Sequence, residues 1–280
     1  MRRALLRRAL LVVPLLAFPA LSAWGQNFAG RASVGTDYKI RKGLHLSLEE
    51  EIRSADDFSA LGSMRTTLAL SYKPVKFLKL GVGGVLINPY KVDKSVKTAA
   101  GEVLYTGFWS PRYRLYGDVS GSLRWGDVQF TLKERLQLTH NTDAGMNVYQ
   151  NPRNALALKS RLGLKYKRWK QVEPSLSFEI RTALNGPWGT TSGTLQTTES
   201  GKTYYAYTPA GYTHVYNNRY RGDLSVEFKP NKHHSISPYL LLDYCSDYEL
   251  DTNGAGNRFY SAAYVDAFVI TAGLSYVFCF

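Results

Sequence analysis

Apolar and polar residues alternate with a period of two along most of the chain from Gln26 onward. This period places successive side chains on opposite faces of a β-strand, so it predicts strands with one apolar and one polar face. About eleven segments show it, most of them roughly 10 to 14 residues long. The segments are 28–40, 44–53, 64–72, 78–86, 112–125, 128–138, 156–165, 172–181, 219–228, 236–244 and 271–280.

The segments are long for a soluble sheet but suit strands that cross a bilayer at a tilt. Short connections, such as 41–43 and 73–76, alternate with long ones, such as 88–107 and 185–212. The sequence therefore predicts an all-β, transmembrane, antiparallel up-and-down β-barrel of about 10–12 strands, with short periplasmic turns and long extracellular loops. Aromatic residues beside the short turns would form one interfacial girdle: Tyr38, Tyr72, Trp125, Tyr166, Phe228 and Phe280.

A secreted β-sandwich is the alternative, because its strands also alternate between core and water. Strand length, the aromatic placement and the carboxyl-terminal pattern favour the barrel. Two features fit it poorly. An odd strand count departs from the even number of most bacterial barrels, so a twelfth strand or a first strand that does not span is expected. Glu50 and Glu134 also fall on the lipid-facing register, where a β-bulge would be needed to turn them inward.

Both ends of the chain carry targeting patterns. Residues 1–25 combine four arginines, a short apolar core and small residues before Gln26, which predicts a secretory signal peptide followed by a barrel over 26–280. The last residues resemble the closing-strand signal read by the barrel assembly machinery during insertion. This signal comprises Thr271, Gly273, Tyr276, Phe278 and Phe280. Together they predict an integral protein of the bacterial outer membrane, surrounded by its lipids.

Composition narrows the function. Without the signal arginines the chain has 31 basic and 22 acidic residues, so its net charge falls from +13 to +9. The basic residues alternate into the barrel interior, and nucleic acid is therefore not an expected partner. No Cys and His cluster suggests a metal site, and no cofactor is expected. Cys245 and Cys279 fall at opposite ends of adjacent strands, too far apart to be expected as a disulfide.

The predicted interior is rich in charge. Three successive strands contribute a basic patch made of Arg112, Arg114, Lys133, Arg135, Lys159 and Arg161. Candidates for lumen ion pairs are Glu49, Glu51, Arg53, Asp118, Glu179 and Arg181. Such groups either plug the lumen as a salt-bridge network or line a narrow, porin-like pore whose basic excess favours small anionic solutes. A non-conducting structural or surface-binding barrel and an anion-accepting channel or binding barrel both remain open.

An enzyme is the least expected class. Some outer-membrane barrels hydrolyse lipids with a His-x-Ser pair on one strand face, and His45-x-Ser47 and His233-x-Ser235 have that spacing. His45 and Ser47 point to the lumen, however, where a bilayer ester would not reach. No catalytic residue is therefore assigned.

The first predicted hairpin also carries a family resemblance. Tyr38 ends the first strand, a basic turn follows, and Glu51 and Arg53 form a Glu-x-Arg pair in the second. With the Lys73-Pro74 turn and the arginine-rich middle strands, this pattern resembles an uncharacterised family of bacterial outer-membrane β-barrels known only as a domain of unknown function. The resemblance implies fold and location, without chemistry.

Overall fold

A computed structural model describes residues 27–55, 58, 60–97, 103–142, 152–209, 211–253 and 258–280. The signal peptide expected at 1–25 lies outside these residues. Within the described ranges, no helix has the length and apolar character needed to span a membrane.

The described residues form fourteen strands. Their bounds are β1 (Asn27–Arg41), β2 (Leu44–Ala55), β3 (Ala60–Val75), β4 (Leu78–Lys97), β5 (Val103–Trp109), β6 (Arg112–Trp125), β7 (Val128–Asn141), β8 (Asn154–Tyr166), β9 (Val172–Gly186), β10 (Gly189–Thr197), β11 (Thr203–Pro209), β12 (His214–Phe228), β13 (His234–Thr252) and β14 (Arg258–Cys279).

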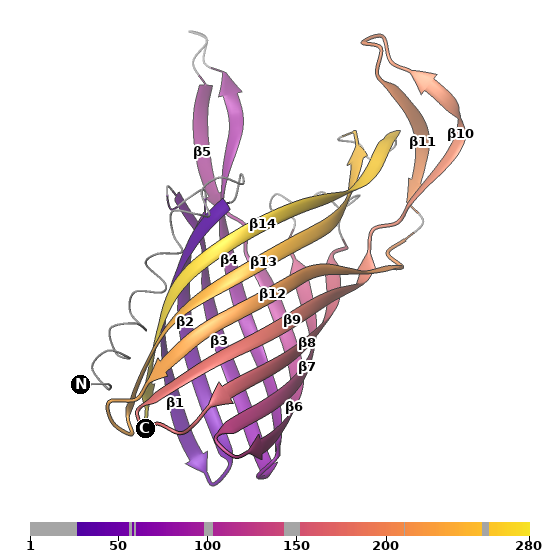
Figure 1. Cartoon of the computed structure of the whole chain (residues 1–280). Helices are drawn as coiled ribbons and strands as arrows, with labels where there is room; N and C mark the ends of the chain where they lie inside the picture. Colours follow the sequence, from indigo (N-terminus) through magenta and orange to yellow (C-terminus); the bar gives the residue numbers. More distant parts are fainter. Residues whose placement is uncertain are drawn as a thin grey trace, which may run out of the picture.

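Eleven of these described strands close into one barrel of tilted strands (Figure 1). Their order around the barrel is β1, β2, β3, β4, β6, β7, β8, β9, β12, β13 and β14, and β14 returns to β1. These are the eleven segments that the alternating pattern predicts, so the barrel is confirmed. At the first tight turn, Gly43 has a φ of 80° and a Cβ there would meet the carbonyl oxygen of Lys73 2.7 Å away. Only glycine suits that position.

The barrel closes through a parallel strand pair. β1 and β14 pair in parallel from Asn27↔Val269 to Asp37↔Cys279, whereas every other neighbouring pair around the described barrel is antiparallel. An odd number of up-and-down strands makes the first and last run in the same direction, so one parallel pair is required. The expected twelfth strand is therefore unnecessary, and the first strand is a full member of the barrel.

The two ends of the barrel differ. Tight turns join the strands at the end that holds Arg41 and Phe228, called here the turn end, whereas three hairpins rise beyond the opposite, loop end (Figure 1). The outer part of β4 pairs with β5, β10 pairs with β11, and the outer parts of β13 and β14 pair with each other. The long connections expected from the sequence are thus largely strand. β11 also contacts β14 through Tyr205↔Phe259.

The barrel is apolar outside and polar inside. Leu115, Leu123 and Leu162 leave 65%, 70% and 53% of their surface exposed on the outer face. Inward polar residues are buried instead, including Gln137 and Asp243, each only 3% exposed. A soluble protein buries its apolar side chains and hydrates its charges. The reversed pattern stabilises the fold only if an apolar medium covers the outside.

Glu50 and Glu134 keep the outward register, and the pairing of their strands shows no bulge beside either residue. The suggested inward turn is therefore wrong. Each carboxylate instead accepts a hydrogen bond from a hydroxyl on the adjacent strand, over 3.0 Å from Thr66 Oγ1 and 2.6 Å from Ser160 Oγ. A charge-assisted bond of this kind offsets part of the cost of an acidic group beside apolar surroundings.

The expected aromatic girdle gathers at the turn end. Tyr38 and Phe280, from the first strand and the last residue, pack edge to face with ring centroids 6.2 Å apart. Tyr166 packs edge to face on Trp169 at 5.3 Å, and Trp125 is 79% exposed. Amphipathic rings in such a band fit the boundary between hydrocarbon and water.

Candidate functional site

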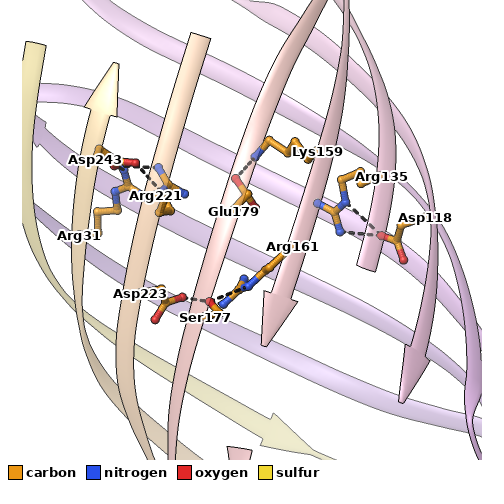
Figure 2. A network of polar contacts seen from close by, with 10 residues as sticks. All are labelled: Arg31, Asp118, Arg135, Lys159, Arg161, Ser177, Glu179, Arg221, Asp223 and Asp243. Carbon is orange, nitrogen blue, oxygen red and sulfur yellow. Dashed lines mark hydrogen bonds and ion pairs between the residues drawn. The ribbon is translucent and has the colours of Figure 1, made fainter. Parts of the chain in front are cut away.

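The lumen is the candidate site, because inward registers bring charged groups from most strands of the barrel together. Figure 2 shows a network of ion pairs that joins several strands of the barrel, called here the ion-pair layer. The first set centres on Asp243 of β13. Its two oxygens accept hydrogen bonds from Arg221 of β12 over 2.7 and 2.9 Å, and Arg31 of β1 lies 3.9 Å away. Asp243 thereby links both sides of the parallel seam.

A second set lies across the lumen on β6 and β7. Asp118 accepts a hydrogen bond of 2.7 Å from Arg135 and forms an ion pair of 3.1 Å with Lys133. The guanidinium of Arg135 also lies 3.8 Å from the ring centroid of Tyr116, in cation–π geometry. The buried carboxylate of Asp118 thus pairs with two cations, so this set has a net positive charge.

Two further pairs complete the layer on β8, β9 and β12 (Figure 2). Lys159 donates to Glu179 over 3.1 Å. Arg161 donates to Asp223 over 2.6 Å and to the hydroxyl of Ser177 over 2.9 Å. Lys159 and Ser177 contribute contacts between the neighbouring strands β8 and β9, whereas Arg161–Asp223 joins β8 and β12, which are not hydrogen-bonded neighbours, and so helps to fix the cross-section of the barrel.

A network at the turn end ties three lysines to two glutamates. Lys165 and Lys229 approach Glu227 at 2.7 and 3.1 Å, and Lys229 also donates to Glu173 over 3.0 Å. Lys167 lies 3.5 Å from Glu173. Desolvation alone would lower the pKa of Lys229, but the hydrogen bond to Glu173 and the charge of Glu227 outweigh it, so the pKa is raised. This turn-end ammonium therefore stays charged at neutral pH.

Two cavities lie in the turn-end half of the lumen. The larger has a volume of about 310 Å³, and its lining contains six lysines and no acidic residue. The lysines are Lys73, Lys76, Lys79, Lys133, Lys165 and Lys167. The smaller, about 80 Å³, lies between Lys133, Arg135, Lys159, Arg161 and Glu179 within the ion-pair layer. In the described part of the chain, Lys73, Lys76 and Lys79 have no ion-pair partner, so the larger cavity carries unbalanced positive charge.

The predicted basic patch is thus partly assembled. Lys133, Arg135, Lys159 and Arg161 face one another across β7 and β8, where Lys133 pairs with Arg161 and Arg135 with Lys159 in register. Arg112 and Arg114 lie nearer the loop end, at the start of β6. Arg114 donates through Nε to Thr139 Oγ1 over 2.9 Å.

The ion-pair candidates divide in the same way. Glu51 binds Arg53 on the same strand, and Asp118 and Glu179 hold the partners described above. Glu49 and Arg181 have no ion-pair partner among the described residues, which corrects their place in the expected network. Arg53 pairs with Glu51 rather than with Glu49. Glu179, which lies on the same strand as Arg181, pairs with Lys159 instead.

Sequence reasoning did not single out Asp243, Asp223 or Arg221 as site residues. Their signal is the inward register of β12 and β13, where Asp243 stands between the outward Leu242 and Tyr244, Arg221 follows Tyr220 and Asp223 precedes Leu224. Cys245, next on this register, and Cys279 are both free thiols.

The carboxyl-terminal residues cover both faces of β14. Inward, Thr271 is completely buried, and a Cβ at Gly273 would overlap the ring of Tyr239. Outward, the hydroxyl of Tyr276 lies 2.8 Å from His234 Nδ1, and the rings of Phe278 and Phe280 pack edge to face at 4.6 Å. The glycine therefore leaves the space that Tyr239 occupies in the lumen.

Neither His-x-Ser pair forms a Ser–His hydrogen bond in the described structure. His45 Nδ1 bonds to Asp37 Oδ1 over 2.6 Å, while the Ser47 hydroxyl donates to the carbonyl of Ala69 over 3.5 Å. His233 bonds to the carbonyl of Cys279, and Ser235 donates to Glu227 over 2.8 Å. A serine nucleophile needs a base within hydrogen-bond reach.

Two solved structures of one outer-membrane protein are similar to this chain at low scores. One is outer-membrane expressed OmpT of Vibrio cholerae, with 13% identity and a TM-score of 0.32 over 80% of this chain and 60% of that one. The other is the same protein folded in vitro, with 12% identity and a TM-score of 0.31 over 83% of this chain and 84% of that one. The chain thus spans about 60% of the length of the first. At these scores neither likeness carries an argument.

None of the curated proteins matches the chain. The profile of one family, "Protein of unknown function (DUF2490)", matches residues 32–224, from β1 into β12. The match covers more than half of the chain and includes the first hairpin and the arginine-rich middle strands that carry the resemblance. The chain therefore belongs to this family of proteins of unknown function.

Proposed function

We propose that this protein is an integral barrel of the bacterial outer membrane whose lumen accepts small anionic solutes and passes them between the two sides. The observation that carries the proposal is the cavity of about 310 Å³ at the turn end, lined by six lysines and no acid. A cleft lined by one sign of charge between low-dielectric walls concentrates ions of the opposite sign. The outward apolar belt supports a membrane location, with the turn end in the periplasm.

The smaller cavity continues this path. It lies within the ion-pair layer, where four basic side chains surround one glutamate. An anion leaving the lysine cavity thus meets further positive charge, and Lys133 lines both cavities. Rings formed by several arginine and lysine side chains are the usual lining of anion and phosphate pores.

Planar-bilayer recording with the purified full-length protein tests the proposal. In a KCl gradient the reversal potential is expected to show chloride preferred over potassium. Lys73→Gln, Lys76→Gln and Lys79→Gln together should reduce that preference, because these lysines have no ion-pair partner in the described structure. Lys202→Gln, on the β10–β11 hairpin outside the barrel, is the matched control and should leave it unchanged. An absence of conductance above background overturns passage.

The ion-pair layer favours a second candidate, a barrel closed to solutes whose function lies in its hairpins. Contacts such as Arg161–Asp223, at 2.6 Å between β8 and β12, cross the interior and narrow it. Cys245 separates the two candidates, since it faces the lumen on the loop side of this layer, in register with Arg219.

In a Cys279→Ser background, an anionic methanethiosulfonate added only from the turn side should modify Cys245 if the lumen is open. It should react about tenfold faster than a cationic methanethiosulfonate, because positive walls concentrate the anion. If Cys245 reacts only from the loop side, the barrel is closed. Equal rates for the two reagents contradict anion preference.

A further inference from the structure

Four lumen arginines in the loop-end half lack the carboxylate partners that several other arginines of the lumen have. They are Arg65 of β3, Arg114 of β6, Arg181 of β9 and Arg219 of β12, called here the arginine cluster. Within the described residues, none of the four lies within ion-pair distance of a carboxylate. By contrast, Arg31, Arg53, Arg135, Arg161 and Arg221 each have one.

Hydrogen-bond donors of the cluster are also left over. The Nε atoms of Arg65, Arg181 and Arg219 are buried and have no hydrogen-bond partner among the described atoms. Arg114 uses its Nε on Thr139. A buried donor without a partner is costly, and native structures rarely keep several in one place unless an ion or water satisfies them. Three such donors in one region of the lumen point to a missing acceptor.

The four guanidinium groups also repel one another. The charge of Arg114 interacts unfavourably with those of Arg181 and Arg219, and also with Arg53 and Arg112. Arg65 is repelled by Arg53 and Arg114. Like charges gathered in a partly desolvated site are stable only with a counter-charge.

The acidic groups that face the cluster supply only part of that counter-charge. Glu51 attracts Arg65 but is bound to Arg53, and Asp247 attracts Arg181 but is one carboxylate beside four guanidinium groups. The other titratable neighbours of Arg181 are Tyr216 and Cys245, neither of which is a permanent anion. The region therefore has more cations than anions.

We infer that the arginine cluster is a binding site for a tetrahedral oxyanion, of the kind presented by phosphate or a phosphate monoester. A guanidinium is planar and permanently charged, and its N–H groups match two oxygens of one phosphate. Free Nε donors suit an acceptor with several oxygens better than a spherical halide. The inward register admits a water-borne solute rather than a lipid headgroup. The inference rests on the proposed function in that the anion must enter the lumen.

Calorimetric titration of the full-length barrel in detergent, with inorganic phosphate as the probe at constant ionic strength, tests the site. Phosphate should bind and should raise the melting temperature, because a ligand of the folded state stabilises it. Arg181→Lys with Arg219→Lys keeps the charge but removes the planar fork, and should weaken phosphate binding about tenfold or more. Chloride should bind much more weakly than phosphate to the unsubstituted protein.

The control changes a basic residue outside the lumen. Lys202→Gln, on the β10–β11 hairpin, should alter phosphate affinity by less than about twofold, since the binding contacts lie elsewhere. Arg181→Gln should fold at least as well as the unsubstituted barrel without phosphate, because it removes repulsion. That variant keeps the test valid if the double lysine variant folds poorly.

The outcomes separate the two proposals. Phosphate binding that depends on Arg181 and Arg219 in a barrel without conductance supports the site and defeats passage. Anion-selective conductance with no preference for phosphate over chloride, or with full phosphate binding in the double lysine variant, overturns the oxyanion site and leaves passage standing.

Discussion

At the residue scale, Asp243 is the group on which the seam depends most. It is 3% exposed and lies between Arg221 and Arg31, whose side chains are 14% and 11% exposed. Removing one member of a buried ion pair leaves the partner charge uncompensated, which costs roughly 3 to 5 kcal/mol. We therefore expect Asp243→Asn to lower the free energy of unfolding by about that amount, as measured by urea titration of the barrel in lipid vesicles.

Asp251→Asn is the control for this substitution. Asp251 pairs with Lys202 at 3.2 Å, but both side chains are 52% exposed, and exposed pairs contribute less than about 1 kcal/mol. Equal losses in the two variants would show that water reaches Asp243 as freely as it reaches a hairpin above the barrel.

At the element scale, closure by β1 and β14 is the feature that a disulfide can test. Ser33 and Ser275 are register partners, and their hydroxyls are hydrogen-bonded over 2.9 Å. Paired residues on adjacent strands lie within the Cα separation that a disulfide requires. With Cys245 and Cys279 changed to Ser, Ser33→Cys with Ser275→Cys should form a bond on mild oxidation. The denatured, non-reduced chain should then migrate faster on electrophoresis.

The matched control moves one cysteine by one residue. Val34 points outward while Ser275 points inward, so Val34→Cys with Ser275→Cys should not form a bond. Absence of the bond in the Ser33 and Ser275 variant, in folded protein, would mean that β1 does not close the barrel.

The strands could be read from the sequence, but their closure could not. A period of two records which face each side chain takes, so the eleven strands and the inward arginines follow from it. A strand with this alternation can pair with either a parallel or an antiparallel neighbour, so the pattern does not indicate that β1 pairs with β14. The pairing of Arg31 with Asp243 is hidden for the same reason, because the two residues meet only through this closure and lie more than two hundred residues apart. Glu134 misleads in another way, since its acceptor role depends on Ser160 of the next strand.

At the scale of the whole molecule, the fold depends on which solvent surrounds it. Leu162 faces outward from β8, in one row with Leu132 of β7 and Phe178 of β9, and all three are about half exposed. Arginine on the lipid face near the bilayer midplane costs about 2–4 kcal/mol, whereas arginine on a water-exposed surface costs little. We expect Leu162→Arg to lower the free energy of unfolding in lipid vesicles by roughly that amount.

Leu195 supplies the comparison, because its exposed fraction of 54% nearly equals the 53% of Leu162 while it lies on β10, outside the closed barrel. Leu195→Arg should therefore leave the stability almost unchanged. The two leucines are equally exposed but differ in whether their strand belongs to the closed barrel, so burial within the protein cannot explain a difference between the variants. A large loss at Leu162 and none at Leu195 would place the outward belt in hydrocarbon. Equal, small effects would mean that water surrounds both leucines. The outward leucines of the barrel would then face water while its charged residues are buried, which is the reverse of the arrangement that is stable in water.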